Sequence, residues 1–347
     1  MKTQQLLNFA RGEWTPGDAG SLTELPSAID GSPVALTGSG GLDFGAMARF
    51  AREVGGPALR AMTFHERARM LKALGLAVLA RKEELYDLNY ATGATRKDGW
   101  IDIEGGAGTL LSFSSKGRRE LPDAHVLLDG QLEPLSKSGL FQGQHIYTPL
   151  QGVAVHINAF NFPVWGMLEK LAPTLLAGVP AIVKPASATA WLAEAAFRVM
   201  IEAGVLPAGA VQLVVGGVGD LFDHLAGQDV VSFTGSAQTA LKLRTHPVIQ
   251  RESVKFIAEQ DSLNASLLGP DAAPGTPEFD LFVAEVVNEM TVKAGQKCTA
   301  IRRAMVPASV LDAAERAIAE RLASLPVGDP RAKETRMGAL VSKAQRD

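Results

Sequence analysis

Hydrophobic and polar positions follow different patterns in successive parts of the chain. In the first 120 residues, apolar side chains recur at helical spacing after a start rich in glycine, proline, serine and threonine, which favours short extended pieces and turns. This spacing predicts helices at about 42–54, 63–81, 83–92 and 97–116. The second of these opens on the capping-box signature of Thr63 and Glu66. Between about 121 and 150, glycines and prolines interrupt short β-prone runs, which indicates an extended excursion or hairpin that needs a surface to pack on.

From residue 152 onward, apolar runs of four to six residues alternate with amphipathic helical segments. The runs predict buried strands at 153–157, 180–184, 211–215, 230–233 and 254–259. Strands that alternate with helices are typical of an α/β fold with a parallel, doubly wound sheet of Rossmann type. Further strands at 264–268 and 301–306 and helices at 280–290 and 311–322 indicate a second α/β unit towards the end of the chain.

Polar residues gather where the predicted strands end, which is where doubly wound sheets bind their ligands. Asn158 and Asn161 follow the first strand, Lys184 ends the second, and Glu259 ends the fifth. Each has an ordinary alternative: Asn161 as a helix cap, Lys184 as a plain strand end, and Glu259 as a surface acid. Their joint occurrence favours a binding site.

Two glycine-containing turns lie at the ends of the other strands. Gly216-Gly-Val-Gly219 is a partial glycine-rich loop, which serves equally well as a turn or as a phosphate cradle. Thr234-Gly-Ser236 follows a strand and opens a helix, so its N–H groups and hydroxyl are placed to meet a pyrophosphate. A plain N-cap serine is the alternative there.

Composition narrows the class of protein. Apolar residues make up 46% of the 347 positions, the net charge is −3, and the mean hydropathy is only +0.09. Basic residues are interspersed with acidic ones, so we expect no nucleic acid or membrane partner. One cysteine forms no intrachain disulfide, no signal peptide or membrane span is readable, and the six histidines are scattered, so we expect a cytoplasmic protein without a metal centre.

The single cysteine lies in the stretch Lys293-Ala-Gly-Gln-Lys-Cys298. Gly295 allows the backbone to bend close to whatever the sulfur meets. Lys293 and Lys297 are near in sequence, and we expect them to favour the thiolate. Taken alone, an inert buried thiol is the more ordinary interpretation.

Four segments together resemble the aldehyde dehydrogenase superfamily over the whole length of the chain. They are Gly152 to Pro163, Val183-Lys-Pro185, Ser232 to Ser236, and Gly295-Gln-Lys-Cys298. Within the superfamily the chain is most similar to the dehydrogenase half of bifunctional phenylacetate-degradation proteins and, second, to semialdehyde dehydrogenases of the benzoyl-CoA pathway. Stretches such as Ile103-Glu-Gly-Gly and Glu259-Gln-Asp-Ser-Leu-Asn264 carry this closer likeness.

The resemblance implies a catalytic set. Cys298 is expected to attack the aldehyde carbon as a thiolate, and the Asn161 side chain and the Cys298 backbone N–H to hold the oxyanion. Glu259 is expected to activate the water that releases the acid. Lys170 is expected to tune the cysteine or relay protons, with a solvated helix lysine as the alternative.

The same resemblance implies a dinucleotide site. The expected cofactor-binding residues are Ile157, Asn158, Ala159, Phe160, Lys184, Ala186, Ser187, Gly217, Thr234, Gly235, Ser236 and Glu259. Ser187 stands where NAD-preferring relatives often carry glutamate, whose carboxylate would repel a 2′-phosphate. Serine removes that repulsion and leaves Lys184 free to pair with the phosphate, so we expect NADP rather than NAD.

The implied organisation has three parts. Residues 1–123 and 152–259 would form the dinucleotide-binding domain, 124–151 an excursion for homodimer or higher assembly, and 260–347 the N-terminal part of a catalytic domain. The family's later Glu-x-Phe-Gly-Pro segment does not occur, so the catalytic domain is expected to be incomplete. The implied substrate is a CoA-linked aliphatic semialdehyde. The alternatives are a catalytically dead nucleotide-binding fragment, a silent regulatory protein, and a CoA-acylating enzyme, which would not need Glu259.

Overall fold

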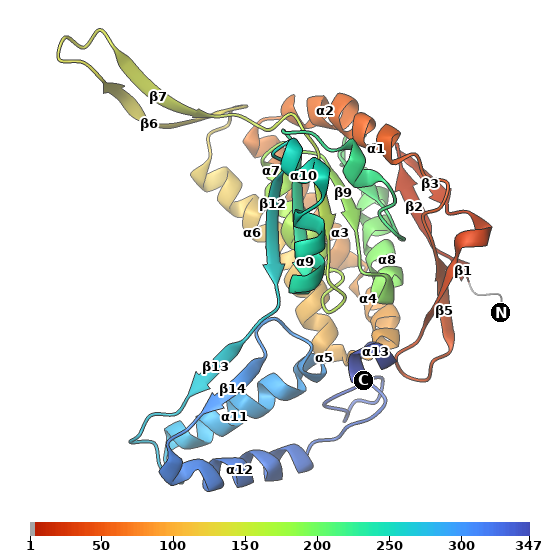
Figure 1. Cartoon of the computed structure of the whole chain (residues 1–347), viewed down its shortest axis with the longest axis vertical. Helices are drawn as coiled ribbons and strands as arrows, with labels where there is room; N and C mark the ends of the chain where they lie inside the picture. The colour runs from red at the N-terminus through yellow and green to blue at the C-terminus, as the bar shows by residue number, and fades with distance from the viewer. Residues whose placement is uncertain (1–3) are drawn as a thin grey trace.

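A seven-stranded sheet lies at the centre of the computed structural model, which describes residues 4–347 (Figure 1). The strand order is β12-β11-β8-β9-β10-β2-β3. The strands are β2 (Leu7–Ala10), β3 (Glu13–Pro16), β8 (Ala154–Ile157), β9 (Ala181–Lys184), β10 (Val211–Leu213), β11 (Val230–Gly235) and β12 (Lys255–Gln260). Strands β8 to β12 are parallel, and β8, the first of them in sequence, lies between β9 and β11. The strand order therefore reverses beside β8, which confirms the doubly wound prediction.

The strand register brings the predicted site residues to one edge of the sheet. Ile157 is level with Lys184 on one side and with Phe233 on the other, and Thr234 is level with Glu259. Because the carboxyl ends of parallel strands meet at one edge, residues from four separate stretches of sequence lie along a single line.

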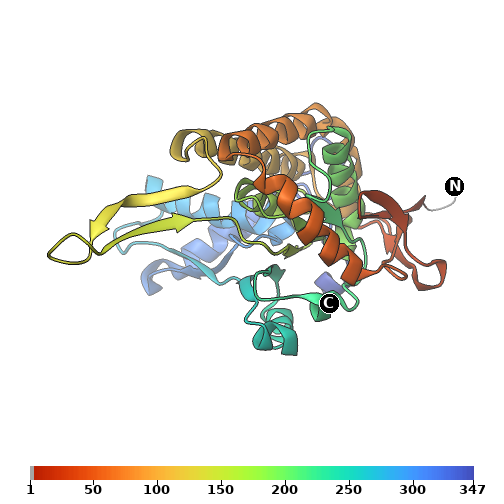
Figure 2. The ribbon, with the colours of Figure 1, turned by 90° about the horizontal axis from the view of Figure 1, so that it is seen from above.

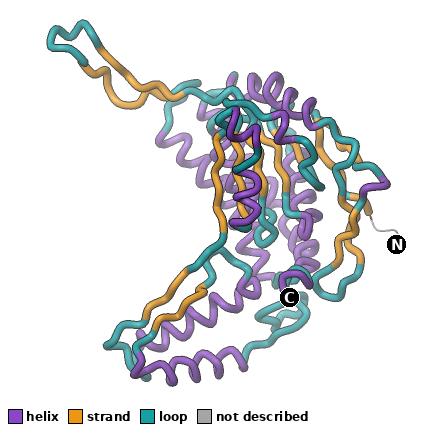
Figure 3. The backbone as a smooth tube through the Cα atoms, viewed as in Figure 1, coloured by secondary structure: helices purple, strands orange, loops and turns teal. Residues whose placement is uncertain are grey.

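Helices cover both faces of this sheet (Figures 2 and 3). They are α1 (Phe44–Phe50), α2 (Gly56–Arg60), α3 (Phe64–Ala80), α4 (Lys82–Asn89), α5 (Arg96–Gly99), α6 (Gly105–Glu120), α7 (Trp165–Leu176), α8 (Ala190–Glu202), α9 (Ala237–Arg244) and α10 (Pro247–Arg251). The capping box at the start of α3 is confirmed, because Thr63 and Glu66 each bind the other's backbone N–H. None of the helices in residues 4–347 is long and apolar enough to cross a membrane.

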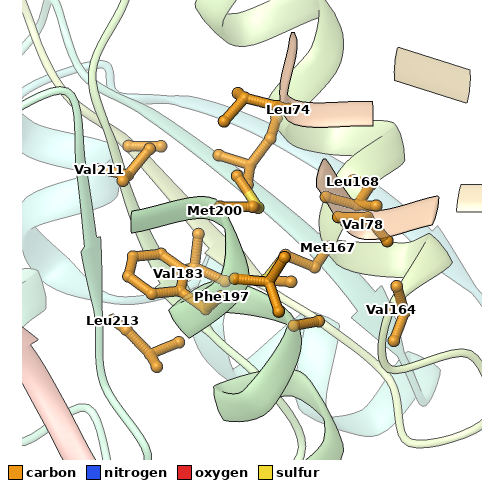
Figure 4. Packing of buried hydrophobic residues seen from close by; sticks show 14 of the residues in the cluster. Leu74, Val78, Val164, Met167, Leu168, Val183, Phe197, Met200, Val211 and Leu213 are labelled. Carbon is orange, nitrogen blue, oxygen red and sulfur yellow. The ribbon is translucent and has the colours of Figure 1, made fainter. Parts of the chain in front are cut away.

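Two hydrophobic cores lie on opposite faces of the sheet. Val183 of β9 belongs to the core formed by α3, α7 and α8, in which Phe197 and Met167 are fully buried (Figure 4). Ile182, one residue earlier, belongs to the other core, with α1, α9 and α10. This alternation follows from the two-residue period of a strand, and it explains why the central strands read as continuous apolar runs.

A two-stranded ribbon projects from the body of the molecule (Figures 1 and 2). It consists of β6 (Leu127–Pro134) and β7 (Gln142–Tyr147), paired antiparallel. Large apolar side chains are exposed along it, including Leu140, which is 91% exposed, and Phe141. The predicted hairpin is confirmed.

The last part of the chain forms a separate lobe below the sheet in Figure 1. The lobe contains β13 (Asn264–Leu267), β14 (Ile301–Met305), α11 (Pro277–Thr291) and α12 (Leu311–Ala323). The chain then returns to the body of the molecule, where α13 (Lys343–Arg346) and residues 26–31 line a common pocket. A third core joins α11 to α12. At the other end, β1 (Gln4–Gln5), β5 (Pro33–Thr37) and β4 (Thr23–Pro26) form a small sheet. The division into domains stays a prediction.

Candidate functional site

A cavity of about 300 Å³ lies between the central sheet and the last lobe. Cys298, Asn161, Glu259 and Lys170 all line it, although they come from four different parts of the sequence. Its other walls are mainly apolar or aromatic and include Ile101, Phe162 and Trp165. The structure thus brings together the whole catalytic set that was expected from the sequence.

The loop before Cys298 has an unusual backbone. Lys293, Ala294 and Gly295 are consecutively left-handed, with φ of 54°, 52° and 71°. Glycine adopts this conformation at little cost, which confirms the expected bend at Gly295, whereas the two preceding residues are strained. The Asn264 amide donates to the carbonyl oxygens of Cys298 and Ala300, so it holds the backbone at and after the nucleophile.

The thiol of Cys298 is not activated in the way that the neighbouring lysines suggested. Burial raises the pKa of Cys298, and the charge of Glu259 and a hydrogen bond to its carboxylate raise this pKa further. The Lys297 ammonium pairs with Glu289 at 2.7 Å, and the Lys293 ammonium lies over the Phe162 ring at 5.3 Å. The expectation that these lysines favour the thiolate is therefore wrong for this conformation.

Asn161 and Lys170 lie on either side of the start of α7. Asn161 does not cap this helix, because the N–H groups of Val164 and Trp165 donate to Asp102 instead. The alternative of a helix-capping asparagine is therefore wrong, and the amide of Asn161 is free of that task.

Lys170 is not a solvated helix lysine. Its side chain is only 11% exposed, and its ammonium donates to the Thr234 hydroxyl at 2.7 Å. Burial lowers the pKa of Lys170, and the charges of Glu169 and Glu259 oppose that shift. Lys170 thus forms part of the cavity wall beside the expected general base.

A second cavity of about 560 Å³ opens on the other side of Cys298 and Glu259. Ala159, Phe160, Thr234 and Gly235 line it, all of them expected cofactor-binding residues. This cavity reaches the sheet edge at which β8 and β11 end, beside the point where the strand order reverses. Its place is that of a nucleotide site in a doubly wound fold.

Two features near this edge fit a dinucleotide. Burial lowers the pKa of Lys184 at the end of β9, and exposed Ser187 follows two residues after Pro185, in the turn that begins the next helix. The side chain of Asn158 is 3% exposed, yet neither its oxygen nor its nitrogen finds a hydrogen-bond partner within residues 4–347. Buried polar atoms are almost always satisfied, so a bound ligand or water is the expected partner here.

The phosphate turn differs from the expectation. The Ser236 hydroxyl caps α9 by accepting the Thr239 N–H at 3.2 Å, and Asp261 accepts the Ala237 N–H at 3.1 Å. Two of the donors at this helix end are therefore already used by the protein, which agrees with the alternative of an N-cap serine, and a role of Ser236 in phosphate binding stays a prediction. Asp261 also has φ of 50°, in the left-handed region.

The glycine-rich turn after β10 packs against the N-terminal part of the chain. The Ser39 hydroxyl donates to the Gly217 carbonyl at 2.6 Å, and a Cβ on Gly216 would lie 2.4 Å from the Ser39 nitrogen. A close backbone contact thus explains Gly216, while a role of Gly217 in cofactor binding stays a prediction.

A family model described as the aldehyde dehydrogenase family matches residues 32–347. The chain belongs to the aldehyde dehydrogenase family. A curated relative, 3,4-dehydroadipyl-CoA semialdehyde dehydrogenase from Aromatoleum evansii, is 48% identical over 342 residues, which cover 98% of this chain and 66% of that protein. The resemblance to the aldehyde dehydrogenase superfamily and, within it, to a CoA-linked semialdehyde dehydrogenase is confirmed.

Solved aldehyde dehydrogenases share the fold. Betaine aldehyde dehydrogenase from Staphylococcus aureus, in complex with NAD+, matches with a TM-score of 0.87 and 21% identity over 99% of this chain and 66% of that one. An NADP-dependent enzyme from Escherichia coli matches with a TM-score of 0.84 and 23% identity over 98% and 68%. The chain therefore spans about two thirds of the length of the aldehyde dehydrogenases that it matches.

Proposed function

We propose that this protein oxidises a CoA-linked aliphatic semialdehyde to the corresponding carboxylic acid, with NADP as the oxidant. The observation that carries the proposal is the meeting of Cys298, Asn161 and Glu259 in one largely apolar cavity. A protein that only binds nucleotides would not need a nucleophile, an amide donor and a carboxylate around the same space. The 48% identity to a CoA-linked semialdehyde dehydrogenase supports the substrate class.

The residues suggest the following chemistry. The Cys298 thiol, which is hydrogen-bonded to Glu259, loses its proton to solvent, and the thiolate adds to the aldehyde carbon. The Asn161 amide and the Cys298 backbone N–H stabilise the oxyanion of the hemithioacetal, and one such donor typically contributes about 3 kcal/mol. After hydride loss the thioester remains on Cys298, and Glu259 removes a proton from the attacking water so that the acid leaves and the thiol is restored.

The cofactor, when bound, supplies the acceptor for the hydride. We assign its ribose and phosphate end to Lys184, Ala186 and Ser187, and its nicotinamide end to the cavity bordered by Phe160 and Thr234. Ser187 carries no negative charge, so a 2′-phosphate meets no repulsion from that position and pairs with the Lys184 ammonium. The remaining expected contacts, among them Ile157, Asn158 and Ala159, belong to the same edge of the sheet.

The substrate proposal now favours a 3,4-dehydroadipyl-CoA semialdehyde. The sequence alone placed the phenylacetate-pathway substrate, 3-oxo-5,6-dehydrosuberyl-CoA semialdehyde, first. The identity to the Aromatoleum evansii protein reverses that order, because it extends over 98% of the chain. Both substrates present an aliphatic aldehyde to the same apolar cavity.

We also propose that the β6–β7 ribbon packs against a second copy of the chain. Leu140 and Phe141 at its tip, together with Leu128 and Ile146 along its strands, leave more apolar surface exposed than an isolated ribbon sustains. Association into a dimer or a higher homo-oligomer covers this surface.

The test is the formation of reduced cofactor by the purified protein with each semialdehyde, with NADP and NAD in parallel. We expect sustained turnover that favours NADP, and a carboxylic acid rather than an acyl-CoA as product. Cys298→Ala is the control that removes the nucleophile. Turnover that survives this substitution, or its absence from the folded wild-type protein with every aldehyde offered, contradicts the proposal.

A further inference from the structure

Lys293 is an almost fully buried cation next to the nucleophile loop. The residue is 6% exposed, and its ammonium lies 5.3 Å from the centre of the Phe162 ring. No carboxylate in residues 4–347 forms an ion pair with it within 4.0 Å. A charged amine is costly to bury, so a residue of this kind is retained where its charge or its position serves the site.

Two buried aspartates provide longer-range counter-charges. Asp102 and Asp98 are 0% and 2% exposed, and both oppose the lowering of the Lys293 pKa that burial causes. Asp98 also accepts the Lys293 backbone N–H at 2.9 Å, while Asp102 accepts the N–H groups at the start of α7. The two acids thus connect the segment 98–102 to both the nucleophile loop and the helix that follows Asn161.

Lys293 and Asn161 also face a common gap. Together with Phe160 and Gln296 they line a small gap with about 10 Å³ of free space, which is room for about one water molecule. Gln296 is itself fixed, because its side-chain amide donates to the Lys293 carbonyl at 2.9 Å. Asn161 therefore borders this gap together with the loop that carries Lys293 and Gln296.

The backbone of the nucleophile loop is strained. Lys293 and Ala294 are both left-handed non-glycine residues, and each such residue costs roughly 1 kcal/mol or more. The loop keeps this conformation because its neighbours bind it: Arg302 donates to the Gly295 carbonyl at 3.0 Å, and Asp98 accepts the Lys293 N–H.

We propose that Lys293 is a positioning residue, whose buried ammonium, balanced by Asp98 and Asp102, locks the nucleophile loop against the Asn161 segment and so fixes the amide of Asn161 relative to Cys298. The proposal rests on the proposed aldehyde oxidation for its kinetic readout. In this proposal, Lys293 affects the reaction only by positioning Asn161 and Cys298, and it does not contact the aldehyde. The group that it helps to place is the oxyanion site, so its removal affects acylation more than binding.

The test uses Lys293→Met and the double variant Lys293→Met/Asp102→Asn. Methionine, like lysine, is not branched at Cβ, so it adopts the left-handed backbone of residue 293 at a similar cost. The comparison with wild type therefore reports the effect of losing the ammonium group. Asparagine at 102 keeps an oxygen for the N–H groups of α7 and removes the buried charge. Lys82→Met is the matched control. The Lys82 ammonium lies 3.0 Å from the Glu104 carboxylate, and this ion pair is outside the cavity.

We expect Lys293→Met to slow the burst of reduced cofactor at least tenfold, with the KM and the cofactor Kd within threefold of wild type. The double variant regains lost thermal stability but keeps the slow burst. A burst at the wild-type rate in either variant overturns the proposal. In the double variant, such a burst shows that the Lys293 ammonium only compensates the buried charge of Asp102. If the single variant does not fold, the double variant decides.

A second readout separates this proposal from the proposed function. Amide hydrogen exchange of residues 292–299 should be at least tenfold faster in both variants than in wild type, with α11 unchanged over 279–287. If the wild-type protein oxidises no aldehyde, the proposed function fails and this exchange measurement still tests the lock. Equal exchange in wild type and variants overturns it.

Discussion

Replacing Glu259 by glutamine should make Cys298 more reactive and the enzyme less active. Burial raises the pKa of Cys298 first, and the charge of Glu259 and the hydrogen bond to it add to that effect. Removal of the negative charge lowers this pKa, so at pH 7 a larger share of the thiol is ionised. Because Glu259 is exposed, the interaction lies near the bulk-water value, about 1 kcal/mol for charges about 4 Å apart.

An energy of that size corresponds to about fivefold more thiolate at a pH below the pKa. We therefore expect Glu259→Gln to be alkylated by iodoacetamide about five times faster than wild type at pH 7. Cys298 is the only cysteine, so mass spectrometry of the intact chain follows this one reaction. Steady-state acid production should fall at least about 100-fold, which is the usual contribution of a general base.

Glu169→Gln is the matched control for this experiment. The charge of Glu169 also raises the pKa of Cys298, but it is the weakest of the causes. Its removal should accelerate alkylation by less than Glu259→Gln does. Alkylation of Glu259→Gln that is no faster than that of wild type would refute the attribution of the raised pKa to Glu259.

Three further predictions concern separate parts of the molecule. Asn161→Ala should lower kcat/KM about 100-fold or more while the cofactor Kd stays within threefold, and a loss below threefold contradicts the oxyanion role. Ser187→Glu should shift the ratio of kcat/KM values towards NAD at least tenfold, and an unchanged ratio removes Ser187 from cofactor selection. Arg67→Leu should lower the free energy of unfolding in urea by about 2–4 kcal/mol, because Arg67 is fully buried and donates to the carbonyls of Leu59, Met62 and Leu176; a change below about 1 kcal/mol would contradict that.

The sheet was predictable because its physics is local. A strand such as Ala181–Lys184 is buried on both faces, so it appears in the sequence as an uninterrupted apolar run between turn residues. Once the strands are known to be parallel, their ends meet at one edge, and Asn161, Lys184 and Glu259 follow as neighbours of that edge. The capping box of Thr63 and Glu66 was equally readable, because its partners lie three residues apart.

The partners of the charged side chains were not predictable in the same way. Lys293 and Lys297 are close to Cys298 in sequence, but their neighbours Phe162 and Glu289 come from other elements. Which charge meets which depends on how α11 packs on the rest of the chain, and no periodicity encodes that. Asn264 had a signal, since it lies within a stretch that carried the family resemblance, although its bond to the Cys298 carbonyl was not expected.

Asp102 and Asp261 show a second limit. Each accepts backbone N–H groups at the start of a helix that is distant in sequence, at Val164 and Ala237 respectively. Capping signatures are recognised when the cap directly precedes its helix, and these two acids reach their helices through space. The contact of Asp261 with α9 was therefore not expected from the sequence.

The projecting ribbon offers a way to detect association of the chain by limited proteolysis. Lys137 lies exposed in the turn that joins β6 to β7, where trypsin can reach the peptide bond that follows it. In a free chain this bond is open to cleavage, whereas the second copy that we propose to pack on the ribbon would shield it. The concentration at which the Lys137 cut disappears from a limited digest would therefore report the dissociation constant of the proposed assembly, without any label or change to the sequence.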